Sequence, residues 1–183
     1  NEHTDTTTGL SQLEGLPAPV ASRMVAILAA DGVNVAELMQ MARALDKAGV
    51  KCELIAPHGG FLKGNNGSEP LQVDKTLLTA DSILYDAVYV PGGADNAAVL
   101  KNDGEALHFI QEAYKHCKAI CATREGSIVV QAAGLPRLQD PAEDPALIVA
   151  PKVAGMSAVA DPFLTALSMH RNFMRVGKKL VAA

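Results

Sequence analysis

Cys121 is the side chain of this sequence best suited to nucleophilic chemistry. It closes the apolar segment 119–121, and a helix is expected to begin near residue 125. A cysteine on a sharp strand-to-helix turn is exposed, and the amides of the following helix lower its pKa. Gly92 and Gly93 follow another apolar segment, and their backbone N–H groups could stabilise an oxyanion. Together with Asn34, which follows the first apolar segment, these residues predict a vestigial nucleophile elbow.

The residues near this predicted elbow include no base. Positions 122–125 are Ala-Thr-Arg-Glu, whereas covalent catalysis needs a neighbouring group that activates the thiol. His58 could approach the same rim, but we expect it at the surface. His108 and His116 lie eight residues apart on one predicted helix, too far to share a metal ion, and His170 falls on the last predicted helix. We therefore predict no confident catalytic residue and no metal or cofactor in this chain.

The other candidate residues have structural interpretations. Asn34 is placed to cap a helix and Glu37 lies three residues on, a variant of the capping box. Cys52 within a strand and Cys117 on an apolar helix face are interpreted as small buried hydrophobes. We expect Cys121 to be the most reactive of the three thiols, because it alone precedes a helix.

Alternating strand and helix patterns predict the elements that would carry these residues. A helix after residue 34 ends at Gly49, residues 64–67 form a turn, and the last helix carries Leu164, Leu167 and Met174 and ends at Gly177. A helix with the apolar face Leu107, Ile110, Tyr114 and Cys117 precedes the segment 119–121, and another spans 125–133. The expected strands are 24–29, 51–56, 85–90, 119–121 and 146–150. This pattern is typical of an α/β, flavodoxin-like, doubly wound and mostly parallel sheet with helices on both faces.

Composition limits the classes of partner and the domain organisation. The net charge of −4 argues against nucleic-acid binding, and no apolar run reaches the length of about 20 residues that crosses a membrane. Residues 1–22 are polar, contain Pro17 and Pro19, and predict a linker or docking arm, followed by one domain over 23–183. The chain starts with Asn1, so we expect a start that is not a native initiation site. The compartment stays open, cytoplasmic or secreted.

Three segments of the chain resemble the PfpI-like family within the class I glutamine amidotransferase-like fold. They are residues 27–33, 88–93 and 118–121, which look like the first strand, the glycine-bearing strand and the approach to the nucleophile. The resemblance implies a cysteine-dependent hydrolase or glyoxalase as one function. Active members carry a glutamate near the cysteine, a position matched here with Asn34, and a His or Gly after the cysteine, where Ala122 stands.

The chain also resembles the degenerate copy of this fold at the C-terminus of large-subunit catalases. Residues 112–116 and 169–173 look like the last helices of that subgroup, and the proline-bearing arm looks like its tether. The resemblance implies a non-catalytic accessory domain of a tetrameric heme enzyme that decomposes hydrogen peroxide, with the heme held outside this chain. Its partners would be the catalase core and other subunits, and unfolded client proteins if the domain acts as an ATP-independent chaperone. A peroxide sensor acting through Cys121 is the third alternative.

Overall fold

Parallel strands form the central layer of the molecule. The computed structural model describes residues 19–136, 143–175 and 177–181. One sheet has the order β5-β2-β1-β6-β7-β8, and every neighbouring pair in it is parallel. This is the flavodoxin-like order with one extra edge strand, so the predicted fold class is confirmed. The strands are Met24–Leu28 (β1), Lys51–Ala56 (β2), Lys75–Thr76 (β5), Ala87–Val90 (β6), Ala119–Thr123 (β7) and Leu147–Ala150 (β8).

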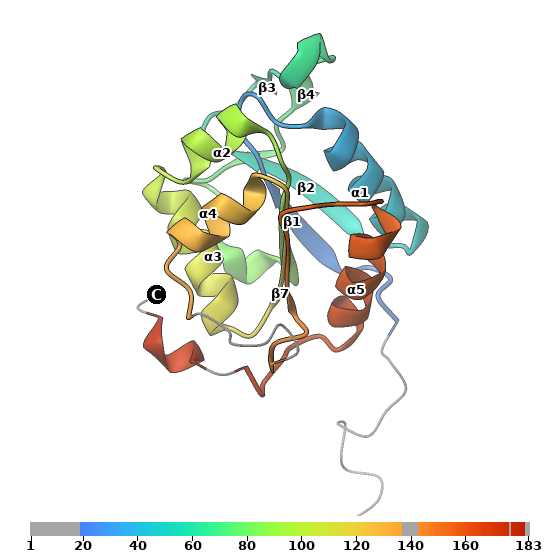
Figure 1. Ribbon diagram of the computed structural model, residues 1–183, viewed down its shortest axis with the longest axis vertical. Helices are drawn as coiled ribbons and strands as arrows, with labels where there is room; N and C mark the ends of the chain where they lie inside the picture. The colour runs from blue at the N-terminus through green and yellow to red at the C-terminus, as the bar shows by residue number, and fades with distance from the viewer. Residues whose placement is uncertain (1–18, 137–142, 176, 182–183) are drawn as a thin grey trace, which may run out of the picture.

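Helices cover both faces of the sheet. Helices α1 (Val35–Lys47) and α5 (Ser157–Ser168) lie on one face. Helices α2 (Ala94–Leu100), α3 (Gly104–Lys115) and α4 (Gly126–Ala132) lie on the other, as Figure 1 shows. The described residues also form short 3₁₀ helices: η1 (Asn65–Gly67), η2 (Ser82–Leu84) and η4 (Lys178–Leu180).

The sheet is shared by two apolar cores. Along β1, Val25 and Ile27 belong to the core under α1 and α5, whereas Ala26 and Leu28 belong to the core under α2, α3 and α4. The exposed fractions of these four residues do not exceed 2%. A strand buried on both faces is expected to be continuously apolar, as the segment 24–29 is.

A small antiparallel hairpin leaves the sheet after β2. Its strands are Phe61–Leu62 (β3) and Leu71–Gln72 (β4), and the turn between them contains Asn66 at a φ of 55°. The hairpin docks on the turn after β1, because the Gly32 amide donates to the Lys63 carbonyl at 2.7 Å. The turn predicted over residues 64–67 is confirmed.

Several predicted boundaries are wrong, and the strand expected over 85–90 begins only at Ala87. Strand β7 continues to Thr123 instead of ending at Cys121, which moves the strand-to-helix turn by three residues to Arg124. The helix predicted to include Cys117 ends at Lys115, and Cys117 follows it in the left-handed region at a φ of 60°. The last helix ends at Ser168, so neither His170 nor Met174 is on it.

Two elements of the structure were not predicted from the sequence, and part of the predicted arm lies outside the described residues. Helix α2, directly after Gly93, and the short strand β5 were not predicted. Residues 1–18 of the predicted arm lie outside the described residues. Within the rest of that arm, the Ser22 amide donates to the Gly49 carbonyl at 2.9 Å and Val20 packs on the core under α1. The domain boundary at residue 23 stays a prediction.

Candidate functional site

The candidate site lies where β1, β6 and β7 end side by side. These strands are neighbours in the sheet, and their carboxyl ends lead into residues 29–34, 91–93 and 124–125. Ligands of open α/β sheets bind at such an edge, near the point where the strand order reverses. The Asn34 amide donates to the Gly92 carbonyl at 2.9 Å, so the first two turns are in direct contact.

Asn34 is a capping residue and points its side chain into α1. Its Oδ1 accepts a hydrogen bond from the Glu37 amide at 3.2 Å, as an N-cap should. The capping function is confirmed.

Glu37 places a buried carboxylate beside the three turns. Only 5% of the residue is exposed, and Oε1 accepts hydrogen bonds from the Gly92 amide at 3.3 Å and the Tyr89 hydroxyl at 3.4 Å. Its Oε2 lies 2.9 Å from Arg124 Nε, although the N–H direction is too poor for a hydrogen bond. Sequence reasoning assigned Glu37 to helix capping and missed this position, because Glu37 reaches Gly92 and not the Asn34 amide.

Arg124, and not Cys121, occupies the sharp turn between β7 and α4. Its φ of 47° places a non-glycine residue in the left-handed region, which is uncommon and strained. The turn is fixed on both sides, because the Arg124 amide donates to the Ala150 carbonyl at 2.8 Å and its carbonyl accepts from Ser127. Gly126 permits this path, because a Cβ there would lie 2.3 Å from the Val90 carbonyl oxygen. The exposed strand-to-helix position therefore carries a guanidinium.

Cys121 lies inside β7, in register with Tyr89 on one side and Ile148 on the other. It is fully buried and belongs to the core under α1 and α5. Burial raises the pKa of this thiol well above its usual range, and the negative charge of Glu37 raises it further. Cys52, which is half-buried, has its pKa raised by burial to about 12. A thiol in this state is a poor nucleophile and a poor peroxide sensor.

The backbone amides of Gly92 and Gly93 already have acceptors. Gly92 donates to Glu37, and Gly93 donates to Glu125 Oε2 at 2.9 Å, which lowers the pKa of the Glu125 carboxyl. Gly93 has a φ of 122°, and a Cβ on it would lie 2.4 Å from the Gly32 carbonyl oxygen. The two glycines therefore sit where we expected them, but two carboxylates of the chain occupy the place of an oxyanion.

Polar contacts behind the turns fix them to the sheet. The Tyr89 hydroxyl lies 3.0 Å from Thr123 Oγ1, and burial raises the pKa of the tyrosine. Asn96, fully buried on α2, accepts from the Ala30 amide at 2.7 Å and donates to the Pro91 carbonyl at 2.9 Å. These two residues were not singled out by the sequence, because a buried Tyr or Asn has no distinctive spacing.

The histidines lie elsewhere. His58 is paired with Asp31 at 3.7 Å, and His116 with Glu112 at 3.1 Å. His170 lies beside Asp86, 3.6 Å away. Within the described part of the chain, no group of three or more His, Cys, Asp or Glu residues could hold a metal ion. Among the same residues, no helix is long and apolar enough to cross a membrane.

The sequence matches a family model described as the C-terminal domain found in long catalases, over residues 21–177. It is 38% identical to catalase HPII of Mycobacterium avium over 91% of this chain, and 34% identical to catalase-2 of Bacillus subtilis over 85%. The chain spans 24% and 21% of the lengths of those two relatives.

Solved structures with the same fold carry DJ-1/ThiJ/PfpI-like domains. A two-domain protein of Anabaena variabilis with DJ-1/ThiJ/PfpI-like and ferritin-like domains superposes with a TM-score of 0.61 and 27% identity, over 64% of this chain and 35% of that one. DJ-1 of Schizosaccharomyces pombe superposes with a TM-score of 0.57 and 19% identity, over 62% and 64% of the two chains. The predicted resemblance to the PfpI-like fold and to the catalase subgroup is confirmed.

Proposed function

The chain belongs to the family of C-terminal domains found in long catalases, and from this premise we propose that it is a non-catalytic accessory domain that stabilises such an enzyme. One observation carries the proposal: the elbow position is Arg124, paired with Glu37, while Cys121 is buried in β7. The parent polypeptide would decompose hydrogen peroxide, and its catalase core and neighbouring subunits would be the partners of this domain.

The proposed lack of a nucleophile at this site rests on where the charges lie. An arginine has no lone pair for attack and keeps its proton at any physiological pH, so it cannot replace a thiolate. Glu37 balances the charge of Arg124 at 2.9 Å, which leaves its carboxylate engaged instead of free to activate a substrate. We therefore propose that this site holds the ends of β1, β6 and β7 together.

The tyrosines of this chain do not fit the axial position of a heme. Catalase iron takes a tyrosine as its axial ligand. The three tyrosines, Tyr85, Tyr89 and Tyr114, have exposed fractions of 2% or less, and all lie within the two cores. A porphyrin would have to displace one of these cores to reach them. We propose that the heme of the parent lies outside this chain.

Stabilisation would come from apolar contact with the rest of the parent. Two groups of large apolar side chains remain exposed, one over Leu78 and Ile83 and one over Met174 and Leu180, each with an exposed fraction above 80%. Such side chains lose unfavourable contact with water when a partner covers them. A covalent tether raises the effective concentration of the domain at the core, so weak contacts would persist and slow unfolding.

Deleting the domain from the full-length enzyme tests the proposal. We expect the turnover number with hydrogen peroxide to stay unchanged, while the half-life at elevated temperature or in urea falls severalfold. The matched control replaces the domain by an unrelated soluble domain of similar size, which should shorten the half-life to the same extent as deletion. If the truncated enzyme were as durable as the intact one, the stabilising function would be refuted.

A further inference from the structure

A cluster of charged side chains lies at the amino ends of β1 and β6, at the edge of the sheet opposite to the candidate site. Arg23 directly precedes β1, and Asp86 directly precedes β6. The turn after α5 brings His170 and Arg171 to distances of 3.6 Å and 3.8 Å from the Asp86 carboxylate. The contacts at the candidate site involve none of these four residues.

Asp86 provides the negative charge of the cluster. Its Oδ1 accepts a hydrogen bond from Arg23 Nη1 at 3.1 Å, and its Oδ2 accepts from the Met24 amide at 2.9 Å. Burial alone would raise the pKa of this carboxyl, but the Met24 amide and the charges of Arg23 and Arg171 hold it below its ordinary value. Asp86 therefore stays ionised in the mildly acidic range, where two guanidinium groups already face its single charge.

His170 contacts this cluster as a hydrogen-bond acceptor. Its Nδ1 lies against Arg23 Nη1, and a guanidinium group can only donate. The ring that makes this contact is therefore neutral and carries its proton on Nε2. A second proton, on Nδ1, would remove the hydrogen bond and place a third positive charge beside Arg23 and Arg171. The side chain is 48% exposed, so water can deliver that proton.

The surroundings of His170 disfavour its protonated form. Burial lowers the pKa of the ring, the positive charges of Arg171 and Arg23 lower it further, and only Asp86 opposes them. The docked ring consequently binds a proton more weakly than a ring free in solution. The contact is at full strength above the ordinary histidine pKa of about 6.5, and it weakens as the pH falls below that value.

The residues that follow His170 cover a cysteine. The Asn172 amide donates to the Cys117 carbonyl at 2.8 Å, and the Arg171 guanidinium interacts electrostatically with the Cys117 thiol. Cys117 is only 4% exposed, although it belongs to neither of the two apolar cores. His170 and Cys117 both adopt left-handed backbone conformations, which are uncommon for residues other than glycine. Detachment of residues 170–172 would therefore expose the Cys117 thiol.

We propose that residues 170–172 form a pH-sensitive latch, which holds the chain after α5 on the amino ends of β1 and β6 while His170 is neutral and detaches when His170 is protonated. Phe173 and Met174 directly follow the latch, so acid would change how their exposed apolar side chains are presented. The latch operates within this chain and does not rest on the accessory function proposed above.

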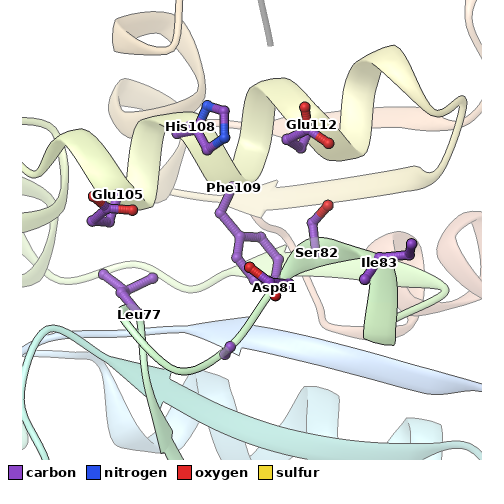
Figure 2. Close-up of a pocket in the computed structure, with 9 residues that line it drawn as sticks. Leu77, Asp81, Ser82, Ile83, Glu105, His108, Phe109 and Glu112 are labelled. Atoms are coloured by element: carbon purple, nitrogen blue, oxygen red, sulfur yellow. The ribbon is translucent and has the colours of Figure 1, made fainter.

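Lys118, directly before β7, is a further cation of this region and interacts with both Arg171 and Asp86. Its Nζ donates to the Ser82 carbonyl, and Figure 2 shows Ser82 on the loop that faces α3. Burial lowers the pKa of Lys118 to about 8, so this side chain is charged throughout the mildly acidic range. A response between neutral and mildly acidic pH therefore belongs to a histidine and not to Lys118.

His116 is the other histidine close to Cys117, since it directly precedes it in the sequence. It pairs with Glu112 of α3 at 3.1 Å, and protonation of His116 would strengthen this pair. Beyond the latch, the chain is anchored by the ion pair of Arg175 with Asp144, which contains no histidine. The opening that we expect is therefore local, between α5 and Arg175.

Thiol labelling at different pH values tests the proposal. The reagent is dipyridyl disulfide, which reacts with thiols in mild acid, and tryptic peptides separate Cys117 from Cys121 because Lys118 lies between them. Each rate is divided by that of the urea-unfolded chain at the same pH, which removes the pH dependence of the reagent. From about pH 7.5 to about pH 5.5, the normalised rate of Cys117 should rise at least about threefold, while that of the buried Cys121 stays within about 1.5-fold.

Three variants identify the histidine that responds. His170→Asn keeps an acceptor and tolerates the left-handed turn, so the rise should disappear. His170→Lys carries a positive charge at neutral pH and should raise the rate at about pH 7.5 about threefold or more. His116→Asn is the matched control and should leave the rise intact.

The proposal is overturned if the unsubstituted chain shows no rise, if His170→Asn keeps the rise, or if His116→Asn abolishes it. An unchanged rate at neutral pH in His170→Lys would also overturn it. The same holds if Cys121 responds to acid as strongly as Cys117, because the chain would then be unfolding as a whole.

Discussion

At the scale of single residues, exposure and not residue type decides which position could carry a nucleophile. Cys121 has the right chemistry but is fully buried, whereas the side chain of Arg124 is 46% exposed at the turn. Arg124→Cys should therefore react with iodoacetamide on the order of a hundredfold faster than Cys121, which needs local unfolding to become accessible. Mass spectrometry of peptides labelled under native conditions measures both rates.

Two further variants complete this test. Adding Cys121→Ser to Arg124→Cys should leave the labelling rate of the new thiol unchanged. Adding Glu37→Gln should speed its labelling, because a neutral side chain no longer opposes formation of the thiolate. Labelling of Cys121 at the rate of the new thiol would show that β7 opens readily and that the assignment of the turn is wrong.

The sequence showed which residues gather at the site, but it did not show which side chains contact each other there. Asn34 was predicted as an N-cap from its place before an apolar helical pattern, and the structure confirms that function. Glu37 was assigned to capping of its own helix, although its partners Gly92 and Arg124 lie 55 and 87 residues away in sequence. Long-range partners leave no local spacing signal, so only the folded chain shows them.

At the scale of elements, one buried ion pair ties the segment after α5 to the loop before β8. Arg175 Nε lies 2.5 Å from Asp144 Oδ2, both side chains are fully buried, and Arg175 Nη1 donates to the Tyr114 carbonyl at 3.0 Å. Asn172 also donates to Asp144 Oδ1, at 2.7 Å. Asp144→Ala should lower the free energy of unfolding by about 3–5 kcal/mol, because it leaves a buried guanidinium unpaired.

The double variant Asp144→Ala with Arg175→Met is the control for that prediction. It removes both charges, so its loss of stability should be smaller than that of Asp144→Ala alone. Urea unfolding followed by circular dichroism measures both differences. A loss below about 1 kcal/mol for Asp144→Ala would mean that the pair does not hold the C-terminal segment in place.

The same ion pair explains why the last helix was predicted too long. The spacing of Leu164, Leu167 and Met174 is helical, but the chain turns at His170, whose φ is 62°. That turn allows Arg175 to reach Asp144 and leaves Met174 85% exposed. The first strands and helix were predicted correctly because continuous apolar runs and capping residues are local signals. The end of β7 was not, since residues 122–124 include no glycine or proline that would separate the strand from the turn at Arg124.

At the scale of the whole molecule, the sheet has a complete apolar core on each face, whereas part of the molecular surface keeps large apolar side chains exposed. The cores contain all three tyrosines and most of the aliphatic side chains, so the fold does not depend on a partner to bury its centre. The C-terminal segment, in contrast, exposes Phe173, Met174 and Leu180 by 62%, 85% and 81%. Apolar surface of this kind can dock on the parent enzyme or hold a partly unfolded client.

The isolated chain should accordingly slow the aggregation of a heated, unrelated enzyme without ATP. At equimolar ratio we expect the rate of light scattering to fall by about half, and the triple variant Phe173→Ser, Met174→Ser, Leu180→Ser should lose most of this effect. The control variant Val99→Ser, Ile128→Ser removes apolar side chains that are 43% and 45% exposed on α2 and α4, and it should protect as well as the unsubstituted chain. Equal protection by both variants would show that the C-terminal segment does not hold clients. No protection by the unsubstituted chain would refute client binding and leave stabilisation of the parent to be judged by the deletion alone.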